Sequence, residues 1–231
     1  MNIAPQDKQG SLETAMAGQY DFTIGEILSE AWERIDGYKM PYAIITSVYF
    51  LIYFGVVILI GVLFRENASR AEGLIQLSGL FMLPMGASLT MMGLSIATAR
   101  PITVKQLFAY YNNKFFPLIG LQIVMTMAVV LGFVLLIIPG IYLSVALVFA
   151  IPLMLEKNLS IVDAFEASRK AVTHHWFKVL GLWLVMGVIF VISALPFGLG
   201  LFWTMPMMMA VVGVLYRRMF GISDQTDTLF V

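Results

Sequence analysis

The chain has 231 residues, of which 60% are hydrophobic and 12% are charged, whereas an average soluble domain has about 25% charged residues. This composition predicts an integral membrane protein and excludes an ordinary soluble domain. The formal net charge is zero and cysteine is absent. The overall charge therefore does not favour nucleic acid as a partner, and disulfides, thiolate catalysis and thiolate metal sites are excluded.

The two ends of the chain differ from its apolar middle. We expect residues 1–21 to form a disordered cytoplasmic tail, because they are polar and small and contain no apolar run. The same lack of an apolar run disfavours a cleaved signal peptide. Residues 22–220 are expected to form a single membrane domain, followed by a short cytoplasmic tail at 221–231.

A helix-start pattern occurs three times, each time ahead of a long apolar stretch. In each copy a hydroxyl residue is followed three positions later by an acid or an amide, the capping-box spacing that satisfies free backbone N–H groups at a helix start. Apolar residues then recur on one face, so each copy predicts an amphipathic helix. The three pairs are Thr23 with Glu26, Thr103 with Gln106, and Ser160 with Asp163.

Four uncharged runs separate these helices, and two of them are too long for a single crossing. About 20 helical residues cross a hydrocarbon core of about 30 Å, so each long run must fold into a hairpin. Pro139 with Gly140, and Pro196 to Gly198, are the expected turns. Cutting there predicts six spans, at 41–64, 74–99, 115–138, 141–155, 178–196 and 200–216. The expected fold is all-α and polytopic, with three repeats of cytoplasmic amphipathic helix plus transmembrane hairpin.

The basic residues predict the orientation of these spans. Twelve of the 14 Lys and Arg residues fall on one side of the predicted membrane, and only Arg65 and Arg70 fall on the other. The positive-inside rule then places both termini in the cytoplasm. Aromatic residues near that boundary, including Trp32 and Trp176, are typical of an interfacial belt.

Apart from Lys178 at the first position of the fifth span, the predicted spans contain no Asp, Glu, Lys, Arg or His, which disfavours proton relays and ion-coupled carriers. His174 and His175 are adjacent on a predicted helix and point about 100° apart, so a shared metal ion is disfavoured. We expect no enzymatic activity, no cofactor and no metal site.

Two patterns predict helix contacts. Residues 22–40 carry a net charge of −2 and residues 100–114 a net charge of +3, so the acidic first amphipathic helix is expected to dock beside a basic one. A stripe of small residues, Gly79, Gly86, Thr90, Gly93 and Ala97, favours close helix packing, either within the chain or between two copies.

The segment from Pro139 to Trp176 resembles a broad bacterial group. It is similar to the YciC-type inner-membrane proteins and to the membrane domain fused to some glycerophosphoryl diester phosphodiesterases. The likeness rests on Pro139 with Gly140, on Pro152, on the acidic residue 156, and on the helix from Ser160 to Ser168 with Asp163. It implies a six-helix module of the bacterial inner membrane and points weakly towards lipids. The chain has no soluble phosphodiesterase domain, so the resemblance implies no catalytic residues.

These observations predict a non-enzymatic bacterial inner-membrane protein that acts by lipid contact or as a scaffold for membrane partners. The alternative is a transporter or channel for a small apolar or amphiphilic solute, with a cleft lined by Gln76, Ser78, Gln122, Thr126 and Ser144. The expected partners are membrane lipids, a second copy or other membrane proteins, and not nucleic acid. The candidate interaction or structural residues are Thr23, Glu26, Trp32, Thr103, Gln106, Pro139, Gly140, Pro152, Ser160, Asp163, Ser168, Arg169, His174, His175 and Trp176.

Overall fold

The computed structural model describes residues 10–222. Every regular element in this range is helical, so the all-α prediction is confirmed. The α-helices are α1 (Leu12–Met16), α2 (Ile24–Arg34), α3 (Lys39–Leu63), α4 (Ala68–Ala97), α5 (Phe115–Leu135), α6 (Ile137–Ala146), α7 (Ala150–Glu156), α8 (Ile161–His174), α9 (Trp176–Ala194) and α10 (Leu201–Phe220), and a 3₁₀ helix, η1, spans Val104–Phe108.

Five segments of the described chain are long and apolar enough to cross a membrane: α3, α4, α5, the stretch Ile137–Glu156 that contains α6 and α7, and α9. This agrees with the prediction of a membrane protein. The last helix, α10, has 20 residues and contains Arg217 and Arg218 in its final turn, and it is not among the five. The predicted repeat of six spans is therefore not confirmed.

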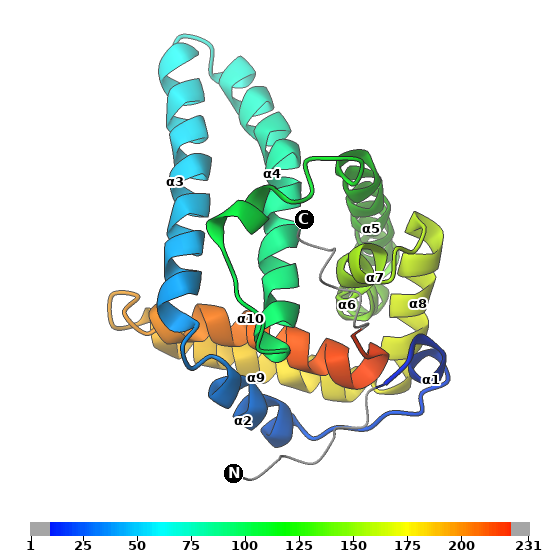
Figure 1. The fold of residues 1–231 in the computed structure, drawn as a ribbon. Helices are drawn as coiled ribbons and strands as arrows, with labels where there is room; N and C mark the ends of the chain where they lie inside the picture. Colours follow the sequence, from blue (N-terminus) through cyan, green and yellow to red (C-terminus); the bar gives the residue numbers. More distant parts are fainter. Residues whose placement is uncertain (1–9, 223–231) are drawn as a thin grey trace.

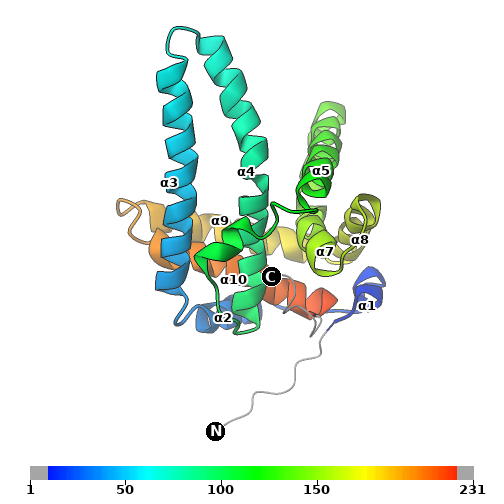
Figure 2. The same ribbon diagram turned by 45° about the horizontal axis from the view of Figure 1, so that its top comes forward.

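The long helices form three hairpins that point in different directions. In Figure 1, α3 and α4 stand upright, whereas α9 and α10 run side by side across their lower ends. α5 is strongly foreshortened in Figure 1, and more of its length is visible in Figure 2. The α5–α6 hairpin therefore points in a third direction. The α3–α4 and α9–α10 hairpins meet where α10 crosses α4.

The crossing of α4 and α10 brings two backbones into contact. An added Cβ on Gly93 would overlap the carbonyl group of Met209, and one on Gly213 would overlap the carbonyl group of Gly93. Part of the predicted small-residue stripe thus packs within the chain, because only glycine allows this approach. A Cβ added to Gly79 or Gly86 would meet nothing within 4 Å.

The predicted turn at Pro139 and Gly140 is wrong by three residues. The chain reverses at Leu136, which has extended backbone angles, and both predicted turn residues lie inside α6. Proline is tolerated there because the first turn of a helix has no intrahelical partner for its N–H. Gly140 packs against α5, where a Cβ would press on the ring of Phe133.

Residues 10–21 differ from the expected disordered tail. Ser11 caps α1 by accepting a hydrogen bond from the backbone N–H of Thr14 at 3.1 Å, and Ala15 and Phe22 are buried. Two apolar anchors therefore hold this segment against the rest of the chain. The remainder of that predicted tail, residues 1–9, and most of the predicted C-terminal tail, residues 223–231, lie outside the described range.

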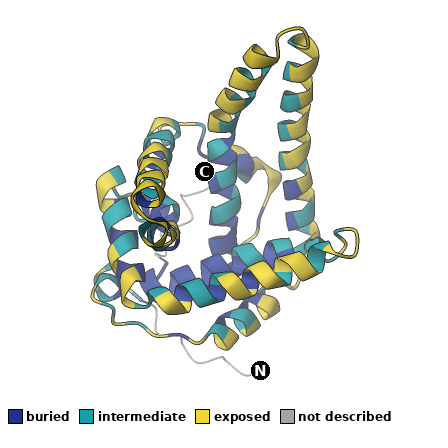
Figure 3. Ribbon diagram, turned by 180° about the vertical axis from the view of Figure 1, so that it is seen from behind, coloured by how far each residue is buried: buried dark blue, intermediate teal, exposed yellow. Residues whose placement is uncertain are grey.

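Burial is concentrated where the hairpins meet. Figure 3 shows buried residues along α10 and the lower half of α4, whereas the free ends of the hairpins are mostly exposed. Buried residues make up 67% of the apolar window of α4 but only 11% of that of α3 and 17% of those of α5 and α9. Three of the five apolar segments therefore carry large uncovered apolar surfaces.

Candidate functional site

The densest set of charges in the described chain joins α2 to the end of α10, and we call it the ionic cluster (Glu26, Glu30, Arg217 and Arg218). Arg218 donates to Glu30 at 2.8 Å through Nη2 and to Glu26 at 3.1 Å through Nη1. Arg217 pairs with Glu30 and also donates to the carbonyl oxygen of Ala97 at 3.1 Å. Since Ala97 is the last residue of α4, the cluster ties three helices together.

The sequence of α2 explains how its carboxylates reach α10. Thr23 caps the helix by accepting a hydrogen bond from the backbone N–H of Glu26 at 3.3 Å, as its capping pattern predicted. Ile27 and Ala31 are fully buried. Glu26 and Glu30, one helical turn apart, lie beside this buried face and therefore share a partner helix.

The acidic helix α2 does dock beside basic residues, but they are not the expected ones. The prediction paired it with a basic amphipathic segment such as residues 100–114, whereas Glu26 and Glu30 pair with α10. Arginine stays protonated at any physiological pH. The ionic cluster is thus suited to holding helices together and not to transferring protons.

A second buried charge lies in α7. The side chain of Glu156 is fully buried; it accepts a hydrogen bond from the hydroxyl of Tyr216 at 2.7 Å and lies 3.2 Å from Nζ of Lys157. A buried carboxylate requires such partners, because removing an ion from water costs several kcal/mol. The sequence places Glu156 directly after the predicted span 141–155 but does not indicate Tyr216 as its partner.

The second helix-start pattern produces only η1, a 3₁₀ helix of five residues. The backbone N–H of Thr103 donates to Oε1 of Gln106 at 2.9 Å, so the predicted pair forms although a long helix does not. Trp32, on α2, is 53% exposed, and Nζ of Lys39 lies 5.9 Å from the centre of its ring. Thr103, Gln106 and Trp32 therefore make contacts that do not involve the ionic cluster.

The third helix-start pattern caps α8 through Ser160, whereas Asp163 contacts the hydroxyl of Ser160 and not the backbone N–H that a capping box would use. Ser160 accepts a hydrogen bond from the backbone N–H of Asp163 at 3.2 Å and donates to its carboxylate at 2.7 Å. Ser168, two turns later, is completely buried; its hydroxyl donates to the carbonyl of Ala146 at 2.8 Å and accepts from the N–H of Phe149 at 3.2 Å. Ser168 thus satisfies both ends of the break between α6 and α7.

Pro152 lies in the first turn of α7 and is buried. The break between α6 and α7 lies directly before this turn. The N–H groups in the first turn of a helix have no acceptor within that helix. Proline has no N–H, so it removes one of these unsatisfied groups after the break.

The two histidines contact the N-terminal segment. Nε2 of His174 lies 3.0 Å from the carbonyl oxygen of Met16, and the ring of His175 meets the ring of Tyr20 edge to face at 4.8 Å between centroids. The hydroxyl of Tyr20 donates to the carbonyl of Ala171 at 2.8 Å. The histidines therefore act as packing and hydrogen-bonding groups for a segment that was predicted to be disordered.

Two ion pairs flank this contact. The hydrogen bond from Lys178 lowers the pKa of Asp21, and the hydrogen bond from Arg169 lowers that of Glu166. Trp176, next to the histidines, donates from Nε1 to the carbonyl of Tyr142 at 3.2 Å and so fixes the start of α9 against α6. All of these groups lie outside the apolar segments or at their ends.

Four of the five polar residues proposed for a transport cleft take part in hydrogen bonds within their own helices. Ser78 and Ser144 each donate to a carbonyl of their own helix, at 2.7 and 2.8 Å, and Gln122 donates to Thr126 one turn away on α5. Such short-range bonds satisfy the side chains without a partner helix.

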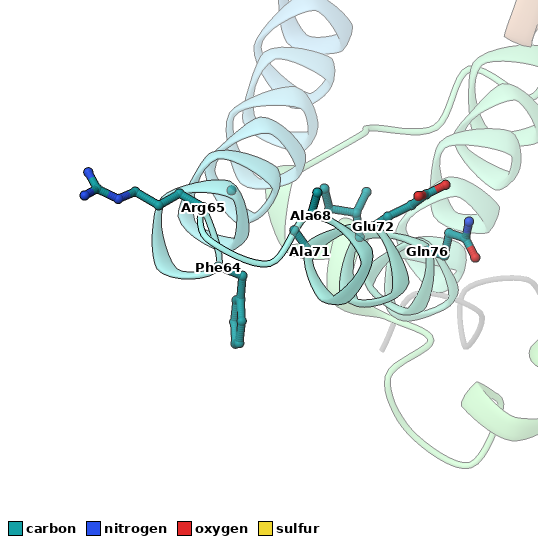
Figure 4. Close-up of a pocket in the computed structure, with 8 residues that line it drawn as sticks. Phe64, Arg65, Ala68, Ala71, Glu72 and Gln76 are labelled. Atoms are coloured by element: carbon teal, nitrogen blue, oxygen red, sulfur yellow. The ribbon is translucent and has the colours of Figure 1, made fainter.

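The surface pockets of the described chain include two at the α3–α4 and α3–α10 contacts. One, of about 380 Å³, lies between the free ends of α3 and α4 and includes Arg65, Glu72 and Gln76. Figure 4 shows Arg65 pointing away from the side chains on α4. The other, of about 180 Å³, is a mainly apolar groove between α3 and α10, with Thr46, Phe50 and Pro206 in its walls. Neither is an enclosed polar cavity.

The described residues contain no group of three or more His, Cys, Asp or Glu side chains placed to hold a metal ion. Of the site residues predicted from the sequence, Glu26 belongs to the ionic cluster, Ser168 lies at the break between α6 and α7, and His174 and His175 contact the N-terminal segment. Others, such as Trp32, Thr103 and Gln106, lie outside these three places. Glu30, Arg217 and Arg218 were missed, although their charges in otherwise apolar surroundings were a usable signal. Compared with protein-family models, curated proteins and solved structures, the chain showed no match.

Proposed function

We propose that the protein is a non-enzymatic protein of the bacterial inner membrane that acts on the membrane itself, by direct contact with lipids. The observation that carries this proposal is the uncovered apolar surface of α3, α5 and α9, of whose apolar windows no more than 17% is buried. Apolar surface of this extent needs an apolar partner.

The pockets favour lipid handling over solute transport. A transporter for a small solute would need a cavity with convergent polar groups, and the polar side chains named for it satisfy their bonds locally. The groove between α3 and α10 is apolar and lies on the surface, where an acyl chain could contact it.

Native mass spectrometry of the purified full chain tests this proposal. We expect phospholipids to stay bound after detergent exchange, and Ala43→Trp, which fills the groove, to reduce the bound amount. Ile44→Trp is the matched control, because Ile44 is a neighbour on the same helix, 54% exposed and outside the groove. Retention of a small solute with no lipid would contradict the proposal and support the transporter alternative.

A further inference from the structure

The free ends of the three hairpins differ in chemistry. The turn between α3 and α4 contains Arg65, Glu66 and Asn67, which suit an aqueous surface. The turn between α5 and α6 consists of apolar residues, with Leu136 68% and Ile138 77% exposed. The loop between α9 and α10 is also uncharged, and Phe197 at its centre is fully exposed at 101%.

A loop of exposed leucine, isoleucine and phenylalanine is costly in water. Each such side chain loses about 1.5–3 kcal/mol of burial energy when it is left in water. Irregular backbone, on the other hand, is tolerated in hydrocarbon only when its polar groups are satisfied internally. The two apolar turns can therefore lie inside the bilayer only if their backbones make their own hydrogen bonds.

Both apolar turns meet that condition over much of their length. In the α9–α10 loop, the N–H of Phe197 donates to Leu195, that of Gly198 to Ala194 at 2.9 Å, and that of Leu199 to Pro196 at 3.0 Å. In the α5–α6 turn, the N–H of Leu136 donates to Gly132 at 3.0 Å.

The α9–α10 loop also contains Pro196, and Pro139 lies in the first turn of α6, directly after the α5–α6 turn. Neither proline has an N–H to satisfy. Ser193, beside the α9–α10 loop, shares a hydrogen bond with Thr204 at 2.5 Å. The polar groups that these turns would carry into lipid are thus fewer than in an ordinary loop.

The directions of the hairpins add an independent constraint. Figures 1 and 2 show α3–α4, α5–α6 and α9–α10 pointing three different ways, and a flat bilayer has only one normal. α3 and α4 have 25 and 30 residues, about 38 and 45 Å of helix, enough for a core of about 30 Å even when tilted. α9 has 19 residues, or about 28 Å, so any strong tilt leaves its far end within the core.

We infer that only the α3–α4 hairpin crosses the bilayer, and that α5–α6 and α9–α10 are re-entrant hairpins whose apolar turns end among the lipid acyl chains. The polar ends of all three hairpins stay on one side, where the ionic cluster and the N-terminal segment are. The inference rests on the proposed function and deepens it, because it names lipid acyl chains as the partner of Phe197 and Leu136. The two re-entrant hairpins would also occupy volume within the acyl-chain region that their turns enter.

Cysteine accessibility in the full chain tests this inference, and the natural chain has no cysteine to interfere. Three single variants are reconstituted into vesicles of phosphatidylcholine and phosphatidylglycerol: Phe197→Cys, Leu136→Cys, and Glu66→Cys as the control in the polar turn. A membrane-impermeant maleimide is supplied to both faces of the vesicles. We expect Glu66→Cys to react rapidly and the two apolar-turn variants to react at least tenfold more slowly, until the vesicles are dissolved in sodium dodecyl sulfate.

Reaction of either apolar-turn variant at the rate of the control overturns the inference for that hairpin, because its turn then reaches water. Protection of the Glu66→Cys variant as well overturns the assignment of α3–α4 as the crossing hairpin. If Phe197→Cys does not fold, Leu199→Cys, 70% exposed in the same loop, replaces it. Lipid retention is measured on the same preparations, so a failure of the re-entrant topology is distinguished from a failure of the proposed function.

Discussion

Replacing Gly93 by alanine tests the backbone contact on which the junction of the hairpins depends. The added Cβ would overlap the carbonyl of Met209 on α10, and this neighbour is backbone, which moves only if the two helices separate. Overpacking of this kind costs about 1–3 kcal/mol. Alanine favours a helix over glycine by about 1 kcal/mol, so the expected net destabilisation is about 0–2 kcal/mol.

Gly86→Ala is the matched control, because Gly86 lies on the same helix two turns away and a Cβ there would meet nothing within 4 Å. We expect this variant to be unchanged or more stable by up to about 1 kcal/mol, from helix propensity alone. Unfolding in mixed micelles of rising sodium dodecyl sulfate content, followed by circular dichroism, measures both. Equal stability of the two variants would refute the close crossing of α4 and α10.

Three further perturbations test other contacts. Ser168→Ala leaves the carbonyl of Ala146 and the N–H of Phe149 without this partner and should cost about 1–3 kcal/mol in the same unfolding assay; a smaller loss would mean that the helix break does not need the hydroxyl. Glu30→Gln should lower the free energy of unfolding by about 2 kcal/mol. This is less than the 3–5 kcal/mol of a fully buried pair, because the Glu30 side chain is 15% exposed. The control Glu33→Gln, on the same helix, should cost under about 0.5 kcal/mol, and equal losses for the two variants would argue against the ionic cluster. The hydrogen bond from Lys178 lowers the pKa of Asp21 in the folded chain. The stabilisation from this contact is therefore complete above the pKa of an aspartate in the unfolded chain, about 3.9, and is lost as the pH falls through the lowered pKa of the folded chain. Protease cleavage of the N-terminal segment should rise in that acidic range, whereas the Asp21→Asn variant should be cleaved at the same rate above and below it.

Local patterns predicted the helix starts well. Thr23 and Ser160 cap α2 and α8 as expected, because a capping residue acts on N–H groups only three positions away. The same signal at Thr103 predicted a long helix, and only η1 forms. The carbonyl of Leu107 in η1 accepts a hydrogen bond at 3.2 Å from Ser88, which lies on α4. The sequence around Thr103 cannot predict this contact with a distant helix.

Turn positions were predicted less well where proline was the signal. Pro196 lies in a loop, whereas Pro139 lies inside α6, since proline suits both a turn and the first turn of a helix. Which of the two forms is decided by the packing of Gly140 against Phe133. The predicted disorder of residues 10–21 failed for a related reason, because composition does not register the pockets that receive Ala15 and Phe22.

The all-α character of the chain, an apolar content high enough for a membrane, and the positions where its capped helices begin can all be predicted from the amino-acid sequence. These properties follow from composition and from interactions within a few residues. The directions of the hairpins, the partner of α2 and the role of Gly93 depend instead on contacts between distant parts of the chain. Those depend on which surfaces, far apart in the chain, fit closely enough for backbones to touch and buried charges to pair, and no local pattern contains that information.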